Sequence, residues 1–370
     1  MKVAVQGASG FVGSRLIERL HLGGMADVVP IVRTHGSLSR IARFDLDWRL
    51  ADGLDGDALT EAFKGCDVAF LSVAGPEPFI LGSPAATIRA ARRAGVSRVV
   101  YLSTAVTLGF NPGPGTDDDT PPVTDQPWTY NRAKARAENL IDDLRHETGV
   151  EVVVLRPSIV YGPRSLSWTT ALAQRLLWRT AFVVDGGANV CNAVYVDNLV
   201  DAMWLAATVP GAANQQFFVA DRERVTWADM YRPIAEAVGV PTSEIHSIDR
   251  AEVGTLLTPP SGVSARISRQ VRSERARRLA SKLPDEAMQR FRRLRGAWRP
   301  AADGVRPGAR DFLSTVPDVE LLVQICDTQL PIAKAERILG YQPIPFAEGA
   351  RRSAAWVTSM GFVADVFAPG

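Results

Sequence analysis

The stretch Lys2–Gly13 reads KVAVQGASGFVG and decides the fold of this chain. Its first five residues, Lys2–Gln6, form an apolar, β-branched run that ends at a glycine, which predicts a buried strand. From Phe11 to His21 the apolar residues recur every three or four positions, which predicts a helix. A strand, a glycine-rich turn and a helix in this order are the context in which such a turn binds the pyrophosphate of a dinucleotide.

Three glycines in this turn have different expected roles. Gly7 lets the chain turn sharply, Gly10 leaves room for the pyrophosphate, and Gly13 allows the helix to pack closely on the strand. The start of the helix offers free backbone N–H groups and the positive end of its dipole to the phosphates. The residues expected to bind the dinucleotide here are Gly7, Ser9, Gly10, Phe11, Val12 and Gly13.

Beyond this turn, strands and helices alternate along the first half of the chain. Further strands are predicted at 27–33, 67–73, 98–104 and 151–156, with helices at 57–64, 84–94 and 130–148. The alternation predicts an α/β fold, a Rossmann-type doubly wound parallel sheet with a smaller C-terminal substrate-binding part. The later elements expected are helices at 169–179, 199–207 and 226–238, a strand at 193–196 and a loop at 254–264. We expect the dinucleotide-binding domain at residues 1–165, with contributions from about 190–220, and the substrate-binding part at 166–370.

The composition argues against several classes of protein. The formal charge of +2 over 370 residues indicates no particular partner. The three cysteines, Cys66, Cys191 and Cys326, lie far apart, which favours a reducing cytoplasm over a disulfide framework. Neither they nor the four histidines have metal-ligand spacing. No apolar run reaches the roughly eighteen residues of a membrane span. We therefore expect a cytoplasmic protein with no transmembrane segment and no bound metal.

The end of the second predicted strand bears on the choice between the two nicotinamide cofactors. An acidic residue at this position binds the ribose hydroxyls of NAD, whereas an arginine accommodates the 2′-phosphate of NADP. This chain has Arg33 there, followed by Ser37 and Arg40. NADP is therefore the preferred expectation, and NAD stays open because Arg33 could be only a solvated strand end.

A tyrosine and a lysine four residues apart, Tyr130 and Lys134, lie on one face of a predicted helix. A phenol with a pKa near about 10 exchanges protons poorly at neutral pH. A neighbouring ammonium group favours the phenolate and lowers that pKa. Thr104, at the end of the predicted strand 98–104, supplies a hydroxyl that can hold a substrate oxygen beside the tyrosine.

Taken together, these motifs resemble the extended short-chain dehydrogenase/reductase family, the group that contains the NAD-dependent epimerases and dehydratases. The resemblance extends over nearly the whole chain. Besides the glycine turn, the residues that carry it are Ala51-Asp-Gly53, Val73-Ala-Gly75, Tyr101-Leu-Ser-Thr104, Tyr130-x-x-x-Lys134, Leu155-Arg-Pro-Ser-Ile-Val-Tyr-Gly-Pro163, Val194-Tyr-Val-Asp-Asn198 and Ala333-Lys-Ala-Glu-Arg-Ile-Leu-Gly-Tyr341.

This resemblance implies roles for particular residues. It places Asp52 near the adenine, Ala74 and Gly75 along the cofactor groove, and Pro157 and Ser158 close to the nicotinamide. It also implies a catalytic triad in which the tyrosine is the general acid–base; its members are Thr104, Tyr130 and Lys134.

The chain departs from the sugar-nucleotide members of that family at informative positions. Ile159 stands where those members often carry an asparagine that helps to hold a diphosphate, and Ile80 stands at a second family asparagine. Thr104 is followed by Ala105 and Val106 instead of the acidic pair of a sugar 4,6-dehydratase. These departures favour a dehydrogenase or reductase that acts on a non-nucleotide alcohol or ketone.

The main hypothesis is therefore an NAD(P)-dependent oxidoreductase that transfers a hydride at a secondary alcohol or ketone of a small metabolite. A sugar-nucleotide epimerase that oxidises its substrate transiently is the alternative enzyme. A cofactor-sensing regulator without catalysis is the alternative of another class, although it has no need of Tyr130 and Lys134. A homodimer is an open alternative because two-helix dimer packing is common among relatives.

A basic segment distinguishes the second half of the chain. Residues 264–299 carry twelve Lys and Arg against three acids, a net charge of +9, so the rest of the chain is net −7. The segment belongs to a helical insert expected at about 258–323, with arginines every three residues from Arg266 to Arg275. A solvated helical cover, a clamp for an anionic substrate and attachment to a membrane surface are open alternatives. Nucleic acid is not expected as a partner, because the acidic remainder would repel its phosphates.

Overall fold

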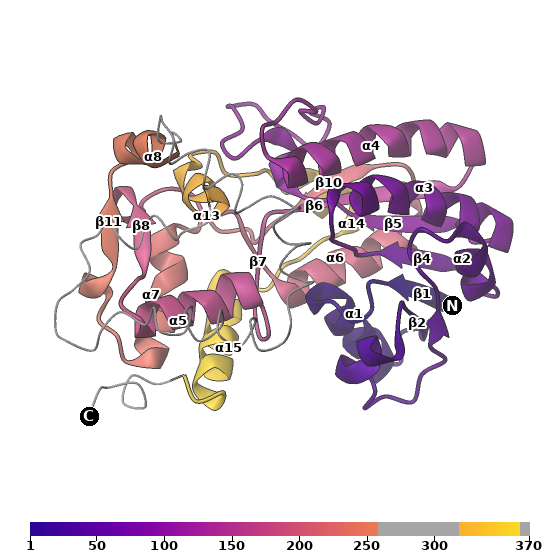
Figure 1. Cartoon of the computed structure of the whole chain (residues 1–370), viewed down its shortest axis with the longest axis horizontal. Coiled ribbons are helices and arrows are strands. Elements are labelled where there is room, and N and C mark those ends of the chain that lie inside the picture. The colour runs from indigo at the N-terminus through magenta and orange to yellow at the C-terminus, as the bar shows by residue number, and fades with distance from the viewer. Residues whose placement is uncertain (258–317, 363–370) are drawn as a thin grey trace, which may run out of the picture.

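The computed structural model describes residues 1–257 and 318–362, and its centre is a seven-stranded sheet in which every pairing is parallel (Figure 1). The predicted Rossmann-type sheet is therefore confirmed. In order across the sheet, the strands are β10 (Gln216–Val219), β6 (Glu151–Pro157), β5 (Arg98–Leu102), β4 (Val68–Leu71), β1 (Lys2–Gln6), β2 (Asp27–Val32) and β3 (Arg49–Leu50).

Helices cover both faces of the sheet, as a doubly wound fold requires. Val3 and Val5 of β1 point into a core with the helices of one face, whereas Ala4 points into the core of the other face. The period of two along the strand thus divides the apolar residues between two layers. The first face carries α1 (Phe11–Leu22), α6 (Val196–Thr208) and α14 (Ala333–Leu339), and the second carries α2 (Gly56–Phe63), α3 (Glu77–Ala94) and α4 (Thr129–Thr148).

A second, smaller part adjoins the carboxyl edge of the sheet (Figure 1). It holds two parallel two-stranded sheets and a separate apolar core built around the buried Trp227 and Tyr231. A capping box starts α7, since Thr226 and Asp229 bond each other's backbone N–H. Its elements are β7 (Ile159–Tyr161), β9 (Ala193–Tyr195), β8 (Phe182–Val184), β11 (His246–Ile248), α5 (Ala171–Leu177), α7 (Trp227–Val238), α8 (Arg250–Leu257), α13 (Asp318–Leu322) and α15 (Phe346–Ser359).

Three expectations about local structure were wrong. The helix expected to begin at Pro84 begins at Glu77, so Ile80 lies buried inside α3 and is not part of a connecting loop. Pro84 is accommodated within the helix and does not mark its start. The strand expected to reach Thr104 ends at Leu102, and residues 254–257 of the expected loop belong to α8.

The basic segment 264–299 lies outside the described residues, as does most of the insert expected at 258–323. The end of that insert is described from residue 318, where α13 is followed by a short 3₁₀ helix, Val323–Ile325. None of the helices that the structure describes has the length and apolarity needed to cross a membrane.

Candidate cofactor and active site

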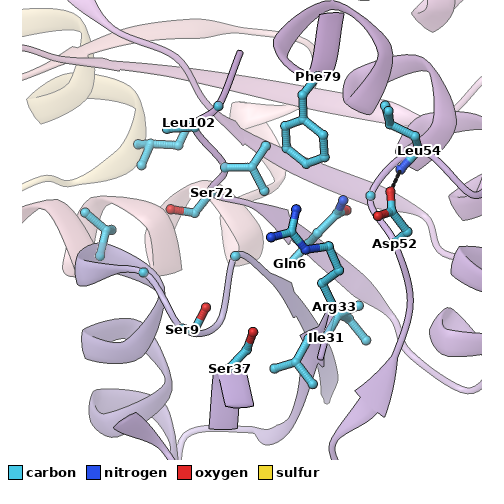
Figure 2. Close-up of a pocket in the computed structure, with 18 of the residues that line it drawn as sticks. Gln6, Ser9, Ile31, Arg33, Ser37, Asp52, Leu54, Ser72, Phe79 and Leu102 are labelled. Atoms are coloured by element: carbon cyan, nitrogen blue, oxygen red, sulfur yellow. Dashed lines mark hydrogen bonds between the residues drawn. The ribbon is translucent and has the colours of Figure 1, made fainter. Parts of the chain in front are cut away.

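A groove of about 700 Å³ lies at the carboxyl ends of the central strands, where ligands bind in doubly wound sheets (Figure 2). It joins the glycine turn to the predicted catalytic pair, although these segments lie more than a hundred residues apart in the sequence. The expected site residues that line it are Gly7, Ser9, Gly10, Phe11, Val12, Arg33, Asp52, Ala74, Gly75, Tyr130 and Lys134.

The glycine turn is built as a cradle that side chains would fill. Gly7 has φ of +89°, and a Cβ there would lie 2.0 Å from the carbonyl oxygen of Ser72 on the neighbouring strand. A Cβ at Gly13 would lie 2.2 Å from the carbonyl oxygen of Gly7, so the start of the helix packs closely on the backbone of the turn. The helix starts at Phe11 with Gly10 exposed as its cap, so its first N–H groups face the groove. The site therefore has the shape and the donors that a pyrophosphate needs.

The far end of the groove contains the residues expected to determine whether NADP or NAD binds. Figure 2 shows two side chains directed into the groove, that of Arg33 from directly after β2 and that of Ser37 from the 3₁₀ helix His35–Arg40. The guanidinium of Arg33 is exposed there, available to an anionic group. Asp52 lies opposite, and one of its carboxylate oxygens accepts a hydrogen bond of 2.9 Å from the backbone N–H of Leu54.

Lys134 is almost completely buried at the other end of the groove. Its ammonium donates hydrogen bonds to the carbonyl oxygens of Leu102 (2.9 Å) and Val73 (3.3 Å), at the ends of β5 and β4. It also lies 4.7 Å from the centre of the Tyr101 ring. Burial lowers the pKa of Lys134 to about 8, and the nearby Glu138 carboxylate acts in the opposite direction. The lysine is thus held rigidly beside the groove and is ionised at neutral pH.

Tyr130 lies one helical turn before Lys134 and lines the same groove, with 42% of the residue exposed. Although the groove is open, the protein around the ring disfavours the phenolate, so burial raises the pKa of Tyr130 to about 12. Among the described residues, no charge or hydrogen bond is found to offset this effect. The lowering by Lys134 that was expected is therefore absent in the chain alone, and the tyrosine keeps its proton at neutral pH.

Four expected site residues do not line this groove. Gly13 is buried beneath the turn, and Thr104 is largely buried at the start of a 3₁₀ helix, Ala105–Leu108, just beyond β5. Pro157 is buried at the end of β6. Ser158, the next residue, borders a second and much smaller cavity.

This second cavity, of about 20 Å³, lies between the segments that follow β5 and β6. No lysine, arginine or carboxylate is among the described residues that surround it. Asn192 is satisfied by the backbone, because it donates to the carbonyl oxygen of Thr328 and accepts from the N–H of Leu330. The apolar residues around the cavity include Val106, Phe110, Ile159, Val190, Val323 and Leu330.

The glycine cradle, the buried lysine and the adjoining tyrosine agree with the comparison against known families. The model of the NAD dependent epimerase/dehydratase family matches residues 3–220, more than half of the chain. The chain belongs to this family. The resemblance inferred from the motifs is thereby confirmed.

Several members of the epimerase/dehydratase family are similar to this chain. The UDP-glucose 4-epimerase of Vibrio cholerae is 32% identical over 170 residues, which are 44% of this chain and 50% of that protein, so the chain matches only half the length of this relative. The 2-alkyl-3-oxoalkanoate reductase of Stenotrophomonas maltophilia is 28% identical over 65% of this chain and 77% of that protein. The crystal structure of gox2253 shares the fold, with a TM-score of 0.69 and 22% identity over 98% of this chain and 99% of that one.

Gln6 and Phe79 are among the residues of the epimerase/dehydratase groove that the sequence did not predict. Gln6 ends β1 directly before Gly7, and its place at the carboxyl end of a central strand was a signal that it would reach the ligand edge. Phe79 was missed because its segment was expected to be a loop. The phenyl ring instead lies on the first turns of α3, against the backbone of Gly53 and Gly75.

Proposed function

We propose that this chain is an NADP-preferring oxidoreductase that interconverts a ketone and a secondary alcohol on an apolar small molecule. The observation that carries the proposal is that Tyr130 and Lys134 line the same groove as the glycine turn. An acid–base residue beside a dinucleotide cradle is what hydride transfer to a carbonyl requires. The cofactor would bind along the 1–165 domain, with support from 190–220, and the substrate would lie against the 166–370 part.

Different residues of the chain would have different roles in such a reaction. The bound dinucleotide would supply the hydride. Tyr130 carries its proton at neutral pH, since its pKa is raised to about 12, and a protonated phenol is the form that can donate to a ketone oxygen. With the cofactor bound, Lys134 together with the positive charge of the oxidised nicotinamide ring would favour the phenolate that is left, and the hydroxyl of Thr104 would hold the carbonyl oxygen. Alcohol oxidation is the reverse step, in which the phenolate form of Tyr130 takes up the hydroxyl proton, so a tyrosine that carries its proton at neutral pH favours ketone reduction.

The residues around the second cavity support an apolar substrate, although the cavity itself has room for only about one water molecule. Its apolar lining includes Ile159, the position at which sugar-nucleotide members carry an asparagine. Burying a diphosphate there without paired donors would be costly, whereas hydrocarbon gains free energy from burial. The name of one relative, 2-alkyl-3-oxoalkanoate reductase, describes a ketone with alkyl chains. The apolar lining and the name of this relative both favour a ketone over a nucleotide sugar in this proposal.

The direct test is an assay of net cofactor consumption by the purified protein. With a 2-alkyl-3-oxo acid or a long-chain ketone, NADPH should be consumed in proportion to the alcohol formed. UDP-glucose with NAD is the comparison, because the relative of highest identity above is an epimerase. Conversion of UDP-glucose without net consumption of cofactor, together with no reduction of ketones, would replace the reductase by the epimerase.

The choice of cofactor is tested at Arg33. Replacing Arg33 with Ala should weaken the binding of NADPH by about tenfold, because an exposed guanidinium that can pair with the 2′-phosphate is lost. The binding of NADH should change by less than about twofold. Arg40→Ala, just beyond this groove lining, serves as the control for loss of charge. Equal affinities for both cofactors in wild type and in Arg33→Ala would refute the preference for NADP.

A further inference from the structure

Gln6 is the last residue of β1, directly before the glycine turn, and its side chain is 4% exposed. Its Oε1 accepts a hydrogen bond of 2.8 Å from the hydroxyl of Thr87, a completely buried residue of α3. This bond anchors the amide from the side of the helices. The same residue lines the cofactor groove, so the amide lies between the protein core and the ligand space (Figure 2).

The nitrogen of this amide is buried and has no hydrogen-bond partner among the described residues. Buried amide donors in folded proteins almost always have a partner, because leaving one unpaired forfeits its interaction with water. With Oε1 accepting from the hydroxyl of Thr87, the nitrogen is the polar atom of the amide that is left without a partner. The described residues therefore leave a buried donor unsatisfied in a side chain that lines the groove.

The surroundings show which part of a ligand would reach the nitrogen. A Cβ placed on Gly53 would lie 2.8 Å from Nε2, so the nitrogen lies against the backbone of Gly53, directly beside Asp52. A Cβ on Gly53 would also lie 2.9 Å from the ring of Phe79. Gly53, Phe79, Gln6 and Asp52 thus meet at the end of the groove that Arg33 also borders.

We propose that Gln6 binds the cofactor, with Nε2 donating a hydrogen bond to an acceptor atom on the adenosine half of the dinucleotide. This inference rests on the proposed dinucleotide cofactor and adds a specificity residue to its binding site. The donor is held in place by Thr87 before the ligand arrives, so little conformational freedom is lost on binding. Gly53 is part of the same arrangement, because a side chain there would displace the amide.

The test is the binding of adenosine 2′,5′-bisphosphate and of NADPH, measured by calorimetry on the full chain. Gln6→Glu keeps an oxygen to accept from Thr87 and replaces the donor nitrogen with an oxygen. Both dissociation constants should rise about tenfold at neutral pH. The affinity should recover when the pH is lowered until the carboxyl group takes up a proton, because the protonated acid can donate again.

Two further variants separate the loss of the donor from the effect of the new charge and from damage to the fold. Gln6→Met fills the same space without a donor, and should lose the same affinity at every pH. Thr87→Val removes the anchoring hydroxyl but leaves the nitrogen, and should change the affinity by less than about threefold. Equal affinity for adenosine bisphosphate in wild type, Gln6→Glu and Gln6→Met would overturn the inference alone. A wild-type chain that binds neither probe would overturn the dinucleotide cofactor, and the inference with it.

Discussion

Replacing Tyr130 with Phe is expected to lower kcat/KM by about 10²–10⁴-fold, the usual contribution of a general acid–base group. The variant removes one hydroxyl from the wall of the groove and keeps the ring. Because the residue is 42% exposed, the free energy of unfolding should change by less than about 0.5 kcal/mol. The affinity for NADPH should also stay within about threefold of wild type.

The matched control is Tyr341→Phe, which removes a buried hydroxyl that donates to the carbonyl oxygen of Ala220, outside the groove. This control should lose some stability and no activity. Steady-state kinetics and a binding titration on the same preparations separate the two effects. Turnover by Tyr130→Phe within tenfold of wild type would show that the proton comes from another group.

The second large effect is expected on stability, at a buried ion pair between α4 and β6. Glu138 and Arg156 are both at least 95% buried, and Oε2 of the carboxylate accepts from Nη2 (2.6 Å) and Nε (3.0 Å) of the guanidinium. The other carboxylate oxygen accepts from the hydroxyl of Ser103. Glu138→Leu would leave the guanidinium buried without its counter-charge. We expect the free energy of unfolding to fall by about 3–5 kcal/mol.

Chemical denaturation measures this loss of stability. Two other variants show whether the loss comes from the unpaired buried charge. Glu147→Leu lies on the same helix, where an exposed carboxylate pairs with Arg89, and should cost less than about 1 kcal/mol. The double variant Glu138→Leu/Arg156→Leu removes both charges and should be more stable than Glu138→Leu alone. A loss below about 1 kcal/mol for Glu138→Leu would mean that water reaches the arginine.

Much of the sheet could be predicted because its signals are local. The strand at Lys2–Gln6 has the predicted bounds, since an apolar run closed by glycine needs no tertiary information. The start of α3 was predicted wrongly because a proline usually marks the first turn of a helix, whereas Pro84 lies buried in the interior of this one. The short strands β7, β8, β10 and β11 have three or four residues each, too few to show a period.

The part of the candidate site that could be predicted is the part whose residues have a fixed spacing in the sequence. Tyr130 and Lys134 are four residues apart on a helix, so they share a face whatever surrounds them. The burial that raises the pKa of Tyr130 depends on segments distant in sequence, and no local pattern signals it. The sequence also could not show that the amide nitrogen of Gln6 lacks a hydrogen-bond partner, because this depends on where Thr87 and Gly53 lie in space.

The most direct test of the central claim is isotope transfer from the cofactor to an apolar ketone. The purified chain is incubated with NADPH deuterated at the transferable C4 position, and the product alcohol is analysed by mass spectrometry. We expect one deuterium at the carbinol carbon, delivered from one face of the nicotinamide, and greatly reduced label with Tyr130→Phe over the same time. Alcohol without deuterium, or no alcohol from any ketone while UDP-glucose is epimerised, would contradict the central claim.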